Sequence, residues 1–120
     1  MRGRVILEVF KIRSDILRGH VDSIILRILM DGDSYGYEIS KEISDRTREK
    51  FQIKEATLYA VFQRLEKKGF IKSYYGDRSH GGKRKYYTIT ARGKMYLDEM
   101  IVEWKEIKEI MAVFLEESAN

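Results

Sequence analysis

The chain has 120 residues, a net charge of +4, and neither cysteine nor proline. Its length allows one small domain that gains stability by pairing with a second copy. The absence of cysteine excludes disulfides, thiolate metal sites and a cysteine nucleophile, and it favours a cytoplasmic location. No apolar run approaches the roughly 18 residues of a membrane span, so a soluble homodimer is expected.

The first half of the chain is expected to be helical. Residues 1–14 mix apolar and basic side chains without the long apolar stretch of a signal peptide, and we expect an amphipathic arm that packs in the dimer. Apolar residues at helical spacing predict a first helix over residues 15–30, capped by Asp15. A second helix is expected over residues 35–46, with Ser34 as its N-cap.

A third helix is expected over residues 55–68, ending at Gly69, a residue that readily takes the left-handed conformation of a helix terminus. At about 100° per residue, one face forms a core stripe: Leu58, Val61, Phe62 and Leu65. The opposite face carries small and polar residues: Ala56, Thr57, Tyr59, Ala60, Gln63, Arg64 and Lys67. Small residues permit close approach and polar residues supply hydrogen bonds, as in a helix that lies in a major groove.

Residues 70–75 and 84–90 are rich in aromatic and β-branched side chains and flank several glycines, which predicts a two-stranded hairpin. The span 54–90 carries nine Lys or Arg and three Asp or Glu, so its charge of +6 exceeds the +4 of the whole chain. A localised basic face of this kind suits a polyanion. A nucleotide-binding P-loop is excluded, because Gly82 stands where that motif requires lysine.

Thr90 is expected to cap a last helix of roughly 25 residues within the segment 91–117. That helix carries two apolar rows: Leu97, Ile101, Trp104, Met111 and Leu115 in one, and Tyr96, Met100, Ile107, Ile110 and Phe114 in the other. A single small domain cannot bury both rows, so we expect the segment to be a dimerisation helix. The alternative is a helix buried within one subunit.

Three segments together resemble the PadR family of transcriptional regulators: SYGYEI at 34–39, ATLYAVFQRLEKKGFI at 56–71, and GGKRKYYTIT at 81–90 with Gly93. The resemblance covers about residues 16–115 and is closest to the smaller members with a single C-terminal helix. It implies an α+β fold and a homodimer. In each subunit, residues 15–90 would form a winged helix-turn-helix whose third helix enters the major groove. Several members of the family are repressors released by small molecules.

The expected DNA contacts fall into two groups. Phosphate contacts are expected from Lys54, which cannot cap a helix, from Tyr35 at a helix N-terminus, and from the hairpin. Base contacts are expected from the outer face of the third helix. The full set is Tyr35, Lys54, Thr57, Tyr59, Gln63, Arg64, Arg78, Lys83 and Arg84. Tyr37 is expected to be structural.

The resemblance also implies an effector site, because some drug-binding members hold a planar ligand between tryptophans of the two C-terminal helices. Trp104 matches that tryptophan, and Ile101 and Lys108 are expected to border it. The charge of Lys108 favours a neutral or anionic aromatic effector over a cationic one. Packing of Trp104 in the dimer interface without any ligand is an equal alternative.

Catalysis finds little support in the sequence. His20 and His80 are the only histidines, and neither has neighbours that suggest a metal site or a catalytic triad. No enzyme activity, cofactor or metal is expected. Two alternatives to a regulator remain open: a protein-interaction adaptor on the same scaffold, and a small-molecule sensor or carrier that works mainly through Trp104.

Overall fold

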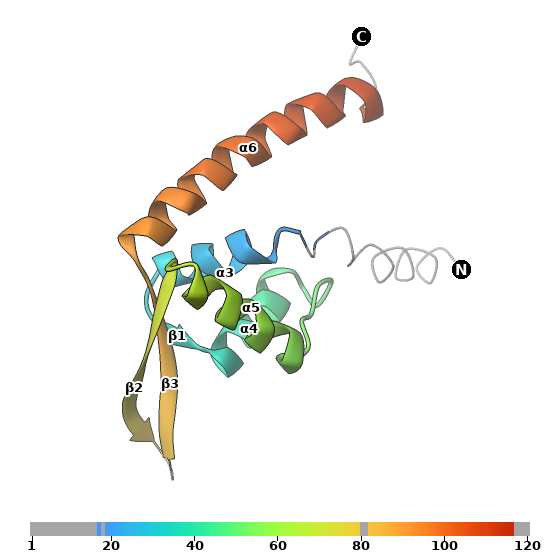
Figure 1. Cartoon of the computed structure of the whole chain (residues 1–120). Coiled ribbons are helices and arrows are strands. Elements are labelled where there is room, and N and C mark those ends of the chain that lie inside the picture. The colour runs from blue at the N-terminus through green and yellow to red at the C-terminus, as the bar shows by residue number, and fades with distance from the viewer. Residues whose placement is uncertain (1–16, 18, 80–81, 117–120) are drawn as a thin grey trace, which may run out of the picture.

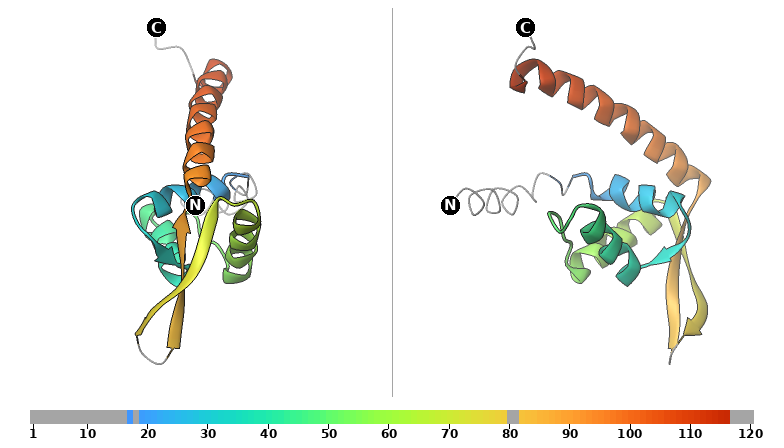
Figure 2. Two further views of the ribbon diagram at one scale, coloured as in Figure 1. Left: turned by 60° about the vertical axis from the view of Figure 1, so that its left-hand side comes forward. Right: turned by 180° about the vertical axis from the view of Figure 1, so that it is seen from behind.

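The computed structural model describes residues 17, 19–79 and 82–116. The elements in chain order are α3 (Val21–Met30), β1 (Ser34–Tyr35), α4 (Gly36–Arg46), α5 (Glu55–Lys67), β2 (Ile71–Ser79), β3 (Gly82–Ile89) and α6 (Ala91–Leu115) (Figure 1). The hairpin β2–β3, called the wing from here on, and helix α6 extend from opposite sides of the body formed by α3, α4 and α5 (Figure 2). The expected α+β architecture is confirmed. The arm expected at 1–14 lies outside the described residues.

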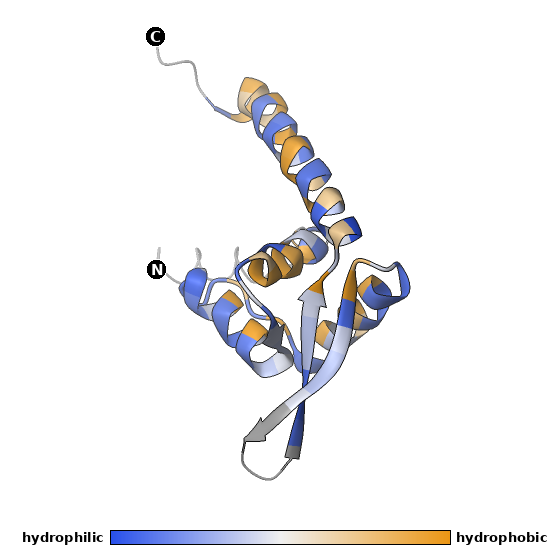
Figure 3. Cartoon of the chain, turned by 90° about the vertical axis from the view of Figure 1, so that its left-hand side faces the viewer, coloured by the Kyte–Doolittle hydropathy of each residue, from blue (hydrophilic) through white to orange (hydrophobic). Residues whose placement is uncertain are grey.

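The core lies between α3, α4, α5 and the root of the wing. Helix α5 buries the predicted stripe of Leu58, Val61, Phe62 and Leu65, so that prediction is confirmed. The ring of Phe62 stacks on Tyr87 of β3, with centroids 4.2 Å apart. Figure 3 shows the same division by hydropathy, with apolar residues concentrated on α3 and polar ones along the wing. This packing fixes the wing beside α5.

The helix predicted over residues 15–30 is interrupted by a turn. Residue 17 is helical, Gly19 and His20 form the turn, and α3 begins at Val21; the predicted cap Asp15 lies outside the described residues. The hydroxyl of Ser23 donates to the main-chain oxygen of His20, 2.8 Å away, and helps to define this start. Glycine inside a helix costs about 1 kcal/mol relative to alanine, which explains the break at Gly19.

Ser34 does not cap the second helix as predicted. It belongs to β1, a short strand that pairs antiparallel with β3, so the sheet has three strands in the order β1-β3-β2. Its side chain donates to Glu38 at 2.5 Å, and the helix α4 takes Tyr35 as its N-cap residue without a side-chain cap. A strand pairing with residues some fifty positions away outcompeted the local cap.

The strands of the wing extend farther toward its tip than the predicted 70–75 and 84–90, with a register irregularity between Gly76 and Ser79. At the root of the wing, Gly69 has φ +82°, which confirms the left-handed end of α5. Gly69 therefore ends α5 and lets the chain turn into the wing within a few residues.

Helix α6 starts as predicted, because the hydroxyl of Thr90 accepts a hydrogen bond from the main-chain nitrogen of Gly93 at 3.0 Å. Within α6 only Gly93 and Leu97 are buried, although Tyr96 stacks on Phe70 with centroids 4.4 Å apart. Beyond these first turns the helix leaves the body. None of the described helices has the combination of length and apolar character that crossing a membrane requires.

Candidate nucleic-acid interface

The outward face of α5 presents the predicted residues to solvent. Thr57, Ala60 and Gln63 are exposed on the side of the helix away from the core. Tyr59 is 46% exposed, and its ring lies against Gly36 at the start of α4. A Cβ atom on Gly36 would lie 3.0 Å from the Tyr59 hydroxyl oxygen, so the missing side chain provides the space for that ring. The centre of this face therefore carries small side chains, and Tyr59 is held in a fixed position at its edge.

Arg64 has a partner that the sequence did not suggest. Its guanidinium donates to the carboxylate of Asp22 in α3, and the two groups form an ion pair. The Arg64 side chain is 46% exposed and that of Asp22 only 12%. Arg64 thus joins α5 to α3 and still presents part of its surface beside the outward face of α5.

Lys54 is the N-cap residue of α5 and makes no side-chain cap, as its chemistry requires. Its main-chain oxygen accepts from the nitrogen of Leu58 at 3.0 Å, and its side chain is exposed. The positive end of the α5 dipole and the lysine charge therefore lie together at the surface. Such a combination attracts an anion.

The wing holds its cations over aromatic rings. The Arg84 guanidinium carbon lies 4.1 Å from the centroid of Tyr35, and the Lys85 nitrogen lies 5.8 Å from that of Tyr87. Lys83 is exposed nearer the tip. Arg78 lies in β2, but its side chain is outside the described set, as is the whole of His80. The predicted Tyr35 and Arg84 are thus brought together across two strands.

Two tyrosines of the wing have altered acidity. Burial raises the pKa of Tyr87 to about 12, with a further contribution from the nearby Glu66 carboxylate. The hydrogen bond to Asp33, at 2.6 Å, raises the pKa of Tyr74. Glu66 also accepts a hydrogen bond from the Ser73 hydroxyl at 2.7 Å, which ties α5 to β2. These contacts hold the wing at a set angle to α5.

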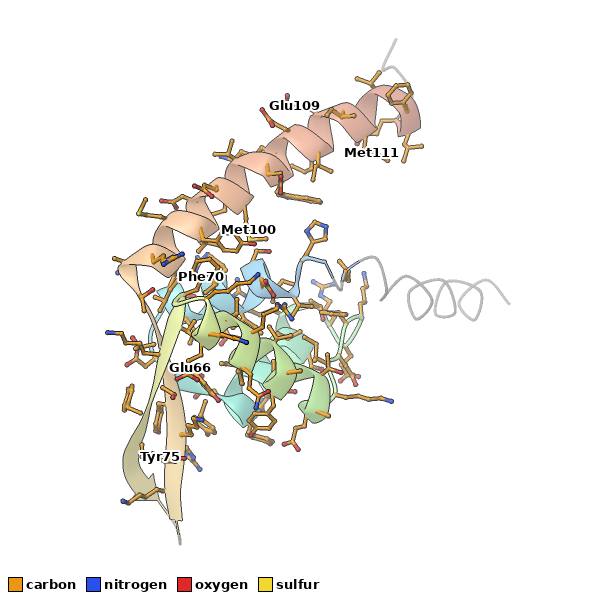
Figure 4. All side chains as sticks on the ribbon, in the orientation of Figure 1. Glu66, Phe70, Tyr75, Met100, Glu109 and Met111 are labelled. Atoms are coloured by element: carbon orange, nitrogen blue, oxygen red, sulfur yellow. The ribbon has the colours of Figure 1, made fainter. Side chains whose placement is uncertain are left out.

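The predicted effector residues lie on the other side of the body, where α6 passes over α3. Trp104 is 48% exposed and meets His20 edge-on, with centroids 5.9 Å apart. It lines two adjacent pockets of about 410 Å³ and 350 Å³, volumes within the usual range for small-molecule sites. Met100 also lines both pockets and points from α6 toward the body in Figure 4.

The pocket walls only partly match the predicted effector site. Ile101 lines the larger pocket together with Trp104, whereas Lys108 lines neither pocket in the single chain. Two cations that the sequence did not single out, Arg27 and Arg46, line the larger pocket instead. Each arginine pairs with an acidic residue four positions away, on its own helix or just beyond the end of that helix. Such local pairs are common on helix surfaces, so the sequence did not indicate that these arginines line a pocket.

Other residues near the candidate interface were also missed. Lys85 and Tyr86 directly follow the predicted Arg84 in β3. Strand alternation, the available signal, puts Tyr86 on the same face as Arg84 and Lys85 on the opposite face. Tyr37 was expected to be structural, but its side chain is 64% exposed on α4, so that expectation is wrong. It follows the N-cap residue of α4 by two positions, where the first turn of a helix faces outward as easily as inward.

An exposed helix with a small and polar face, preceded by a second helix and followed by a basic antiparallel wing, defines a winged helix-turn-helix protein. Comparison with known proteins agrees. Residues 25–99 match the PadR-like family of transcriptional regulators, and the chain belongs to this family. The resemblance stated from the sequence is confirmed.

The similarity extends over most of the chain. An uncharacterised protein X of Lysinibacillus sphaericus is 68% identical over 105 residues, which cover 88% of this chain and 96% of that protein. A transcriptional regulator from Clostridium thermocellum is 50% identical, with a TM-score of 0.79 and coverage of 85% of this chain and 99% of its own. Bacillus subtilis PadR in complex with operator DNA shares the fold at 24% identity, with a TM-score of 0.62 and coverage of 68% and 46%.

Proposed function

We propose that this protein is a homodimeric repressor that binds an inverted-repeat operator in double-stranded DNA. The observation that carries the proposal is the exposed face of α5, which lies beside the basic wing and away from α6. Helix α5 enters the major groove, and the wing follows the adjoining backbone. The solved complex of Bacillus subtilis PadR with operator DNA supports this use of the fold.

Within this proposal the predicted residues take three roles. Thr57, Tyr59 and Gln63 face the base edges, where small neighbours allow close approach. Lys54, Arg78 and Lys83 contact phosphates, because lysine and arginine at flexible or helix-terminal positions bind the backbone without reading sequence. Arg64 contacts the DNA from the edge of the face while it remains joined to Asp22. Arg84 contributes from the wing and Tyr35 from the neighbouring strand β1.

The dimer is proposed from the apolar surface of α6. Val113, Phe114 and Leu115 are 75%, 77% and 72% exposed in the single chain. Three adjoining apolar side chains with this exposure are costly in water and typical of an interface. A second copy packed along the segment 91–117 covers them and sets two α5 helices at a fixed spacing, which an inverted repeat matches.

A small aromatic effector is proposed to bind beside Trp104. Trp104 lines both pockets, whose walls are mostly apolar, and in the larger pocket Arg27 and Arg46 favour a neutral or anionic ligand over a cation. An effector that prefers one spacing of the two subunits weakens DNA binding that needs another spacing, by the same free energy with which DNA weakens effector binding. Ligand binding beside Trp104, which the sensor alternative takes as the main function, would then regulate DNA binding.

The test is a titration of DNA from upstream of the protein's own gene, followed by fluorescence anisotropy at 50 and 200 mM salt. Six to ten phosphate contacts per dimer imply that affinity falls by about 10³–10⁵ over this range. Gln63→Ala is expected to reduce the preference for operator over unrelated DNA. Glu109→Gln, at an exposed position of α6 that lines neither pocket, is the control and retains that preference.

A flat salt response would contradict the phosphate contacts. Salt-sensitive binding without sequence preference would contradict the role of α5 in reading bases and would leave only a general DNA binder. If no DNA is bound while ligands quench Trp104 fluorescence, the sensor alternative replaces the repressor. Binding of a partner protein that survives Gln63→Ala and Lys83→Ala in the absence of DNA binding points to the adaptor.

A further inference from the structure

Three tyrosines form a row across one face of the sheet. Tyr35 of β1 pairs with Tyr86 of β3, and Tyr86 pairs with Tyr74 of β2. Paired residues in neighbouring strands point to the same face. The rings of Tyr35 and Tyr86 meet edge-on with centroids 5.5 Å apart, and those of Tyr86 and Tyr74 stack at 5.7 Å. We call these three residues the aromatic row.

The aromatic row is held in place at one end and at its middle ring. The Tyr74 hydroxyl donates to Asp33 at 2.6 Å, which ties β2 to the turn before β1. Gly76 lies under the middle ring, because a Cβ atom there would lie only 2.7 Å from Cε1 of Tyr86. A side chain at Gly76 would displace that ring. The position of Tyr86 is therefore built into the strand opposite it, and Tyr86 in turn supports Tyr35.

Arg84 shares this face of the sheet, since it precedes Tyr86 by two residues in β3. Its guanidinium carbon lies 4.1 Å from the centroid of Tyr35. Stacking uses the flat surface of a guanidinium and leaves the N–H groups at its edge available to other acceptors. The contact also restrains a side chain that otherwise samples many rotamers.

We propose that Tyr35 is a positioning residue, which acts through Arg84 and does not bind DNA with its own hydroxyl. The aromatic row holds the Tyr35 ring, the ring holds the guanidinium of Arg84, and the edge of the guanidinium binds the DNA backbone next to the groove read by α5. The inference rests on the proposed DNA binding. It replaces the expectation that Tyr35 contacts a phosphate directly from the start of α4.

The two roles of Tyr35 differ in what they require of the side chain. A phosphate contact needs the hydroxyl, and phenylalanine lacks it. A stacking contact needs the ring, and phenylalanine keeps it while leucine does not. A positioning role further requires that the effect of losing Tyr35 vanish once Arg84 is gone, because two residues that act through one contact are not additive.

The experiment compares Tyr35→Leu, Tyr35→Phe, Arg84→Ala and the double variant Tyr35→Leu/Arg84→Ala in operator titrations at one salt concentration. Because a dimer has two wings, Tyr35→Leu is expected to raise the Kd by about five- to thirtyfold. Tyr35→Phe recovers most of that loss. The double variant binds no more weakly than Arg84→Ala alone. Circular dichroism confirms that each variant is folded.

Tyr75→Leu is the matched control, since it makes the same substitution in the wing at a position that is 64% exposed and outside the aromatic row, and it should bind as the wild type does. If the double variant binds more weakly than Arg84→Ala alone, Tyr35 acts independently of Arg84 and the inference is overturned. It is also overturned if Tyr35→Phe binds as weakly as Tyr35→Leu, because the hydroxyl is then the contact. A wild-type protein that binds no DNA contradicts the proposed function itself, an outcome visible before any variant is compared.

Discussion

Arg64 of α5 and Asp22 of α3 are 42 residues apart in the sequence, and in the fold they form an ion pair between the outward-facing helix and the helix beneath α6. Asp22 is almost covered, whereas nearly half of the Arg64 side chain meets solvent. Helix α3 has Ser23, Ile24, Arg27 and Ile28 on the wall of the larger pocket. One helix therefore touches both the proposed effector pocket and a residue of the proposed DNA surface.

The two halves of this ion pair are expected to differ in their contribution to stability. Arg64→Ala leaves a mostly buried carboxylate without its partner and should lower the free energy of unfolding by about 1–3 kcal/mol. Asp22→Ala leaves an arginine that water can reach, so its cost should be smaller, about 0.5–1.5 kcal/mol. Urea unfolding followed by circular dichroism measures both. The double variant should be more stable than Arg64→Ala alone, and equal stability of Arg64→Ala and wild type would contradict the coupling.

Gly93→Ala is expected to destabilise the junction between the wing and α6. The new Cβ atom would lie 2.2 Å from the main-chain oxygen of Phe70 and 2.9 Å from Cγ1 of Ile89. Backbone must shift to relieve the first contact, at a cost of about 1–3 kcal/mol or more. Thermal unfolding measures the loss. Lys94→Ala, at the next and exposed position of α6, is the control; equal melting temperatures for the two variants would show that the junction tolerates the methyl group.

Stability should fall in alkali through Tyr87. Burial raises the pKa of Tyr87 from 10.0 to about 12 in the folded protein. The unfolded chain loses the proton at lower pH than the folded one, so this contribution is complete below pH 10 and is lost as the pH rises through 12. The pKa difference corresponds to about 2–3 kcal/mol.

The alkaline loss is measured by urea unfolding between pH 9 and pH 12. Tyr87→Phe keeps the stacking on Phe62 and removes the titrating group, so its stability should depend less on pH than that of the wild type. Tyr37→Phe, at a position 64% exposed on α4, is the matched control and should follow the wild type. Parallel curves for wild type and Tyr87→Phe would assign the alkaline loss to other groups.

Lys54→Ala should weaken DNA binding equally for operator and unrelated DNA. A phosphate contact carries no sequence information, and each one contributes about 0.9 to the slope of log K against log salt. Two subunits supply two such lysines, so the slope should become shallower by about two. Lys105→Ala removes the same charge from an exposed position on α6, and its slope should stay that of the wild type. An unchanged slope for Lys54→Ala would remove Lys54 from the interface.

Met111→Lys should dissociate the proposed dimer. Met111 lies on the side of α6 that carries the apolar rows, and Glu109 lies on the opposite side (Figure 4). A lysine at Met111 would place two like charges in the interface, and the dimer Kd should rise about 100-fold or more. Sedimentation velocity over a range of concentrations measures this. Glu109→Lys introduces the same side chain two residues away and should leave the dimer intact, so a monomer in both variants would place the interface elsewhere.

The sequence by itself determined the features that depend on neighbouring residues. The core stripe of α5, the left-handed Gly69 and the Thr90 cap follow from helical periodicity and from backbone groups within a few positions. Their physical cause is local, so spacing and residue type sufficed to predict them. The family could also be predicted from the sequence, because each of its motifs is a contiguous stretch of residues.

Only the tertiary structure decided which distant side chains meet. Ser34 became a strand residue because β3 offered it a partner, Arg84 stacks on Tyr35 across that pairing, and Arg64 found Asp22 on another helix. The walls around Trp104 likewise come from three helices. These contacts depend on how the elements pack, and packing is set by the buried faces acting together, which no local spacing encodes.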